Sequence, residues 1–85
     1  MTVYVDNARL PFRGMLMSHM LADTDDELRA MAHVIGLQER WHQGDHFDIN
    51  QEMRSIALAN GAKQITQREA VLIRRKFRQT KDSSQ

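Results

Sequence analysis

The segment from Thr24 to Gly36 constrains the fold more than any other part of this 85-residue chain. Thr24 and Glu27 form a capping box, in which a hydroxyl and a carboxylate satisfy the exposed N–H groups of a first helical turn. Apolar residues then recur at i, i+3, i+4 and i+7, namely Leu28, Met31, Ala32 and Ile35. Gly36 supplies a left-handed stop, so the segment predicts an amphipathic helix over residues 25–35.

Two further helices are predicted by signals of the same kind. Asn50 is a candidate N-terminal cap for a helix at residues 51–60, which carries apolar residues at helical spacing and ends before a glycine. Thr66 and Glu69 form a second capping box, which predicts a helix at residues 67–78. Helices therefore account for about half of the chain.

The stretches between the predicted helices have the character of short strands. The candidates are TVYVD at 2–6, MLMSHML at 15–21, HFDI at 46–49 and AKQI at 62–65. NARLPFRG, between the first two, contains asparagine, proline and glycine and predicts a loop. We therefore expect an α/β fold, with a small sheet of three or four short strands and about three helices. It forms a single domain over residues 1–78, followed by a flexible polar tail at 79–85.

An internal regularity links two of the expected strand–helix units. Asp23 begins D-x-x-x-E-L-R-A-M-A-x-x-x-G, and Asp48 begins D-x-x-x-E-M-R-S-I-A-x-x-x-G, a shift of 25 residues. Either an ancestral βα unit was duplicated, or generic helix signals converged on the same spacing. In both cases the alignment predicts that Asp23 and Asp48 occupy equivalent points, where a strand leads into a helix.

Several classes of protein are excluded by what the composition lacks. Without cysteine there is no disulfide and no thiolate metal site or nucleophile, so a metal would need histidine and carboxylate ligands. No apolar run approaches the length that spans a bilayer, and MTVYVDN lacks the features of a signal peptide. We expect a cytoplasmic protein with no membrane association. A phosphate-binding glycine loop and a G-x-S-x-G nucleophile motif are also missing.

Charge is distributed unevenly along the chain. Residues 1–62 hold nine acidic and five basic side chains, net −4, whereas residues 63–85 hold seven basic and two acidic, net +5. The last predicted helix carries a cluster of cations, namely Arg68, Arg74, Arg75, Lys76 and Arg78. This basic helix is a candidate surface for nucleic acid or for an acidic protein surface, and the alternative is a solvated face that maintains solubility.

The decapeptide WHQGDHFDIN, residues 41–50, raises the question of a reaction centre. Five groups from separate parts of the chain are candidates for one catalytic site, namely Asp6, His19, Asp23, His46 and Asp48. If parallel strands place them at one sheet edge, Asp6, Asp23 and Asp48 are candidate metal ligands, and His19 or His46 would ligate or act as general base. The cofactor would be a divalent metal, manganese or magnesium.

The same residues also have purely structural interpretations. Aspartates at strand ends are commonly turn or cap residues, and Asp48 in particular can cap the second helix. The loop of eight residues at 7–14 is short for a parallel crossover. An antiparallel first pair of strands would carry Asp6 to the edge opposite Asp23.

Several motifs together resemble domain of unknown function 4031, a family of small bacterial and phage proteins. They are YVDN, HMLADTDDELRAMAHVIGL, W-x-Q-G-D-H-F-D-I and R-x-I-A-x-x-x-G-A-x-x-I-T-x-R-E, which cover nearly the whole chain up to the basic helix. The resemblance implies no activity, cofactor or partner. It implies that these polar residues lie in recognisable motifs: Asp6, Asn7, His19, Asp23, Asp45, His46 and Asp48.

Two functional hypotheses from different classes follow. The first is a divalent-metal-dependent phosphoesterase or nuclease-like protein, in which the basic helix binds phosphate. The second is a non-catalytic accessory module that binds nucleic acid or protein through the basic helix. Dependence on a metal distinguishes them, since only the enzyme would lose its activity with a chelator.

Overall fold

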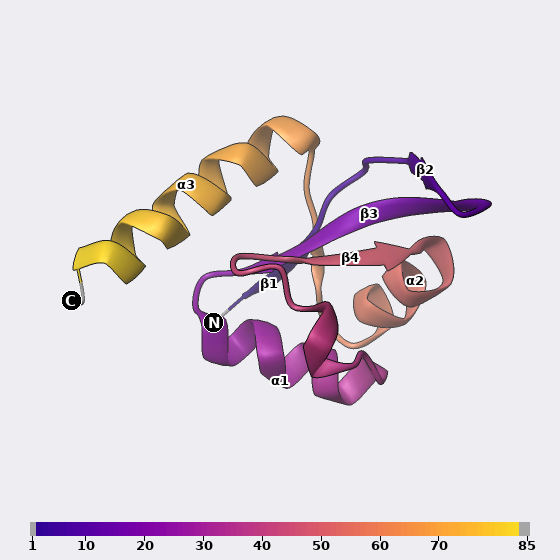
Figure 1. Cartoon of the computed structure of the whole chain (residues 1–85), viewed down its shortest axis with the longest axis horizontal. Coiled ribbons are helices and arrows are strands. Elements are labelled where there is room, and N and C mark those ends of the chain that lie inside the picture. The colour runs from indigo at the N-terminus through magenta and orange to yellow at the C-terminus, as the bar shows by residue number, and fades with distance from the viewer. Residues whose placement is uncertain (1, 84–85) are drawn as a thin grey trace.

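The computed structural model describes residues 2–83 and contains a five-stranded sheet, three α-helices and one 3-10 turn (Figure 1). The strands are β1 (Val3–Val5), β2 (Leu10–Phe12), β3 (Met15–Ala22), β4 (Phe47–Asn50) and β5 (Lys63–Gln64). The helices are α1 (Asp25–Ile35), η1 (Glu39–Trp41), α2 (Gln51–Ala59) and α3 (Gln67–Ser83). The predicted α/β class is confirmed. Within the described residues, no helix has the length and apolarity that a membrane span requires.

The eight-residue strand β3 lies at the centre of the sheet. Its later residues pair antiparallel with β1, and its first residues pair antiparallel with β2. Its other edge pairs antiparallel with β4, in a register that places His19 opposite Asp48. The short strand β5 adds parallel to β1. Because β1 and β2 follow one another along the same edge, the chain leaves the ladder between them, at residues 6–9.

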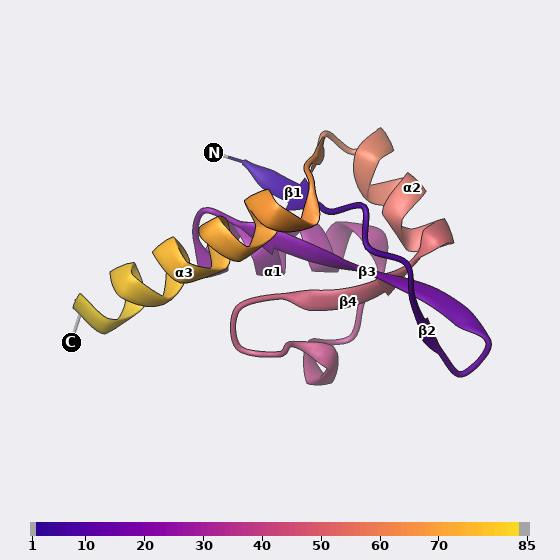
Figure 2. The same cartoon turned by 90° about the horizontal axis from the view of Figure 1, so that it is seen from above.

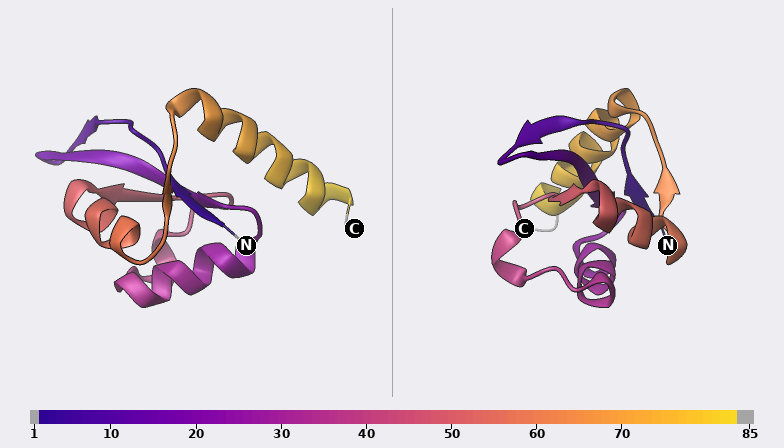
Figure 3. Two further views of the ribbon diagram at one scale, coloured as in Figure 1. Left: turned by 180° about the vertical axis from the view of Figure 1, so that it is seen from behind. Right: turned by 90° about the vertical axis from the view of Figure 1, so that its right-hand side faces the viewer.

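Helices cover both faces of the sheet (Figures 1 and 3). On one face, α1 and α2 bury Leu28, Ala32 and Ala57 against strand residues such as Met20 and Phe47. On the other face, α3 packs on a smaller cluster, formed by Leu21, Ile65 and Ala70. Since successive strand residues point to opposite faces, β3 directs Met20 toward α1 and α2 and directs His19 and Leu21 toward α3.

The helix starts agree with the capping signals in the sequence. The Thr24 hydroxyl accepts a hydrogen bond from the Glu27 N–H at 3.2 Å, and Asn50 Oδ1 accepts one from the Met53 N–H at 2.8 Å. The capping box of Thr66 and Glu69 is reciprocal, with bonds of 3.0 and 3.1 Å. Each cap satisfies backbone groups that a helix terminus leaves without a partner.

One strand was not predicted. Residues Leu10–Phe12 form β2 within the segment expected to be a loop, because the chain reverses over Arg13 and Gly14 and returns along β3. Both turn residues have positive φ, 50° and 78° respectively, as a two-residue hairpin turn of this type requires. The sheet therefore has five strands rather than three or four.

The C-terminal helix is longer than predicted. α3 extends to Ser83, five residues beyond the expected end at residue 78, so most of the predicted tail at 79–85 has helical backbone. Residues 84 and 85 of that tail lie outside the described residues. The single domain predicted over residues 1–78 includes all five strands and most of α3.

The two aligned strand–helix units are present as β3–α1 and β4–α2, but they do not place their aspartates equivalently. β3 and β4 are antiparallel, so the two units point in opposite directions. Asp23 follows β3, whereas Asp48 lies inside β4 and Asn50 is the cap of α2. The shared spacing therefore reflects similar helix patterns and does not generate a shared ligand edge.

Candidate metal centre

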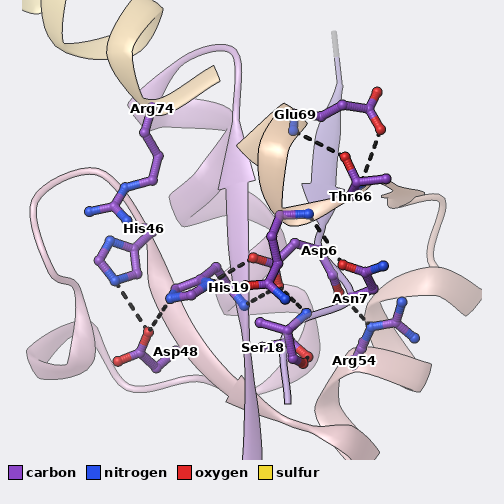
Figure 4. Close-up of polar contacts among 12 residues, drawn as sticks. Asp6, Asn7, Ser18, His19, His46, Asp48, Arg54, Thr66, Glu69 and Arg74 are labelled. Atoms are coloured by element: carbon purple, nitrogen blue, oxygen red, sulfur yellow. Dashed lines mark hydrogen bonds and ion pairs between the residues drawn. The ribbon is translucent and has the colours of Figure 1, made fainter. Parts of the chain in front are cut away.

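Two histidines and one aspartate meet on the face of the sheet that α3 covers (Figure 4). His19 on β3 and Asp48 on β4 are directly paired across the ladder, so their side chains share this face. His46 lies two residues before Asp48 and reaches the same side. Asp48 Oδ1 is 3.2 Å from His46 Nε2 and 3.8 Å from His19 Nε2.

His19 is held from behind by Asp6. Its Nδ1 lies 2.7 Å from Asp6 Oδ2, and the other carboxylate oxygen accepts the backbone N–H groups of His19 and Ala8 at 2.9 and 3.2 Å. The carboxylate thus takes the place of a strand carbonyl where the chain leaves β1. Asp6 is only 1% exposed. Its burial would raise its pKa, but the hydrogen bonds from His19 lower the pKa below its usual value. The hydrogen bond to Asp6 in turn raises the pKa of His19.

His46 has a corresponding support in Asp45. Its Nδ1 lies 2.6 Å from Asp45 Oδ1, while the second oxygen of that buried carboxylate accepts from Arg74 Nε at 3.2 Å and Arg78 Nε at 2.9 Å. Burial alone would raise the pKa of Asp45, whereas the hydrogen bonds from His46, Arg74 and Arg78 lower it to about 2. Asp45 therefore stays ionised, and it ties α3 to the loop that carries His46.

These supports determine which nitrogen of each ring faces the centre. An ionised carboxylate only accepts hydrogen bonds, so each Nδ1 donates its hydrogen to the aspartate behind it. A neutral imidazole then presents the lone pair of Nε2, and both Nε2 atoms face the Asp48 carboxylate. The three ligand atoms lie within 4.8 Å of one another. Lone pairs and negative charge at this spacing require a proton or a cation among them.

The donor set matches that of a divalent transition metal. Two imidazole nitrogens and one carboxylate oxygen suit zinc, manganese or iron(II), whereas magnesium prefers oxygen ligands and water. Histidine ligands that donate their other N–H to a carboxylate are a recurring second layer of protein metal sites. The site is partly open, with side-chain exposures of 20% for His19, 12% for His46 and 39% for Asp48. Three protein ligands on one side leave positions for water or substrate.

The five residues proposed from the sequence are separated by the structure into three roles. His19, His46 and Asp48 form the cluster, and Asp6 stands behind His19 with its oxygens turned to N–H donors. Asp23 lies at the other end of β1, where it accepts the Tyr4 hydroxyl at 2.8 Å and bonds the Thr2 carbonyl through its backbone. The cause is the antiparallel pairing of β1 and β3, which brings Asp6 beside His19 and carries Asp23 away.

Asp45 is the functional candidate that sequence reasoning did not single out. Its motif contains three polar residues in four positions, D-H-F-D, and nothing local distinguishes the supporting aspartate from the ligand. The distinction depends on α3, since Arg74 and Arg78 approach from 29 and 33 residues away. Only a rule linking a buried aspartate to the basic helix would have found it.

The cations of the basic helix differ in their surroundings. Arg74 is 29% exposed, and Figure 4 shows its side chain pointing from α3 toward His46. Arg78 is bonded to Asp45 but remains 62% exposed, while Arg68, Arg75 and Lys76 are exposed on the same helix. A shallow hollow lies between α3 and the loop before β4, lined by Gln43, Gly44, Asp45, Arg74, Phe77 and Arg78. Positive charge therefore borders the metal centre on one side.

Comparison with known proteins identifies the family but no activity. The chain belongs to the protein family of unknown function DUF4031, whose sequence model matches residues 3–77, and this confirms the resemblance noted from its motifs. No significant match was found among curated proteins or among solved structures. The matched segment includes the whole metal-centre cluster with both supporting aspartates.

Proposed function

We propose that this member of the family is a divalent-metal-dependent phosphoesterase that acts on nucleic acid or on another phosphate-bearing ligand. One observation carries the proposal: two imidazoles, each fixed by an aspartate on Nδ1, direct Nε2 toward the same carboxylate. A hydrogen-bonded surface cluster has no need of two buried supports. A metal site does, because they fix the ring orientation and raise the basicity of the ligand.

The residues around the centre have separate roles in this chemistry. His19, His46 and Asp48 bind the ion, and Asp6 and Asp45 position the two imidazoles. A bound divalent ion lowers the pKa of a coordinated water and polarises a phosphoryl oxygen. Arg74 is the nearest cation of α3 and supplies positive charge for a phosphate held at the open side. This donor set favours manganese or zinc over magnesium.

The test is hydrolysis of a phosphodiester by the metal-loaded protein. We expect bis(4-nitrophenyl) phosphate or a labelled oligonucleotide to be cleaved with manganese or zinc and to be left intact with a chelator. His46→Ala should abolish cleavage. The matched control is His33→Ala, since His33 is an exposed histidine on α1, which covers the opposite face of the sheet. Cleavage that survives both the chelator and His46→Ala would refute the proposal.

A second candidate function rests on a different observation. The exposed arginines Arg68 and Arg75 flank the helix turns that hold Arg74, so α3 presents cations whether or not a metal binds. A non-catalytic module would use this helix to bind nucleic acid or an acidic protein surface. Binding of an oligonucleotide without cleavage, in the presence of manganese or zinc, would favour this alternative.

A further inference from the structure

An exposed apolar strip lies on the same face of the sheet as the metal centre. Leu10, Phe12 and Met15 are 49%, 53% and 40% exposed. Leu10 is paired with Met17, and Phe12 with Met15, and directly paired residues share a face. Met15, Met17 and His19 alternate along β3, so they also share that face. The apolar strip of Leu10, Phe12, Met15 and Met17 therefore leads along β3 to the centre.

No helix covers this strip. Figures 1 and 2 show that α3 crosses the sheet from β1 toward the end of the molecule opposite the β2–β3 hairpin. Phe12 lies opposite Met15, four residues from His19 along β3, which corresponds to about 13 Å at the usual rise of a strand. The aromatic ring is thus close enough for one extended ligand to contact both it and the metal centre.

The charge around the strip is positive. Residues 7–22 contain Arg9 and Arg13 and no acidic side chain. Arg13 occupies the hairpin turn with φ of 50°, and its guanidinium carbon lies 5.3 Å from the centroid of the Phe12 ring. Together with Arg74 on the far side of the centre, these cations bracket an apolar path. The complementary ligand is a flexible polyanion with flat apolar groups.

We propose that the strip binds single-stranded nucleic acid, with a base stacked on Phe12, phosphate groups at Arg9 and Arg13, and the strand continuing toward the metal centre. This inference rests on the proposed function and names its substrate class. Exposed aromatic rings beside cations bind single strands without needing a particular sequence. A duplex keeps its bases stacked on one another and has no base free for Phe12. A protein strand is disfavoured because Pro11, in the middle of β2, has no N–H for an added ladder.

The experiment measures binding in the absence of catalysis. Fluorescence anisotropy with oligo-dT and oligo-U of about ten nucleotides, in chelator, separates binding from cleavage and DNA from RNA. We expect Phe12→Ala to weaken single-strand binding roughly 5- to 100-fold and Phe12→Tyr to retain it. The matched control is Trp41→Ala. Trp41 is 45% exposed with Arg40 at 6.0 Å from its ring, but η1 lies near α1, away from α3 (Figure 1).

Several results would overturn the inference. Equal affinities of Phe12→Ala and Trp41→Ala would show that Phe12 stacks on nothing, and equal binding of duplex and single strand would show that no base is engaged. A protein that is dimeric in light scattering and becomes monomeric on Phe12→Ala would assign the strip to self-association. Loss of metal-dependent cleavage in His46→Ala with unchanged binding in chelator would support both proposals. Binding without any cleavage in wild type would retain this inference and refute the phosphoesterase.

Discussion

The carboxylate of Asp6 accepts three hydrogen bonds, two from backbone N–H groups and one from the His19 ring. It therefore closes the gap in the sheet between β1 and β2 and fixes the ring that faces the metal centre. An asparagine at this position keeps one acceptor oxygen and turns an NH₂ group toward a donor. At the scale of single residues, the fold and the site depend on the same atoms.

We predict that Asp6→Asn lowers stability by about 1–3 kcal/mol and weakens metal affinity by about 10- to 100-fold. Chemical denaturation and calorimetric titration with manganese measure the two effects. Asp23→Asn is the matched control, since it loses only the bond to Tyr4 and should leave the metal affinity unchanged. If Asp6→Asn binds manganese as tightly as wild type, Asp6 has a structural role alone.

A second prediction concerns pH and Asp25 at the start of α1. Partial burial would raise the pKa of Asp25, but hydrogen bonds from Arg29 and His42 lower it below its usual value of 3.8. A lowered folded-state pKa contributes stability that is present above pH 3.8 and is lost as the pH falls through the folded value. The melting temperature of Asp25→Asn should therefore lie below wild type at neutral pH and converge with it near pH 3. Asp26→Asn, at the next position of the same turn, is the control, and a gap that persists at low pH would contradict the assignment.

Elements differ in how far the sequence predicts them, and the difference follows the range of the interactions that form them. α1, α2 and the start of α3 are set by local signals, such as the Thr24 and Thr66 capping boxes, and were predicted within a residue or two. β2 was missed because its apolar residues gain a ladder only from β3. The meeting of His19 and Asp48 depends on the β3–β4 register. It cannot be read from either segment alone.

At the same scale, the basic helix has distinguishable cations. Arg74 and Arg78 hold Asp45, so their loss would disturb the site as well as any contact with nucleic acid. We predict that the double variant Arg68→Ala, Arg75→Ala weakens DNA binding and reduces its salt dependence by about 0.7 to 0.9 in log–log slope per lost phosphate contact. Arg40→Ala, on η1, should leave the slope unchanged. Gel shifts at several salt concentrations measure this, and an unchanged slope in the double variant would assign α3 to a solvated face.

At the scale of the whole molecule, the metal centre joins segments that are far apart in the sequence. His19 comes from the middle of β3 with Asp6 behind it, His46 and Asp48 come from β4 and the loop before it, and α3 is fastened to that loop through Asp45. The unfolded chain has no such arrangement. An ion that binds only the folded protein stabilises it by mass action, by about 2.7 kcal/mol at a free concentration of 100 times its Kd.

The melting temperature of the protein with and without manganese or zinc tests this account most directly. For a domain of this size, we predict a rise of roughly 10 to 20 °C in wild type at a metal concentration of 100 times Kd. Asp48→Asn should abolish the rise, because it removes a ligand that is 39% exposed, whereas Asp23→Asn should keep it. Identical melting curves for wild type with and without metal would contradict the account, as would an equal loss of the rise in both variants.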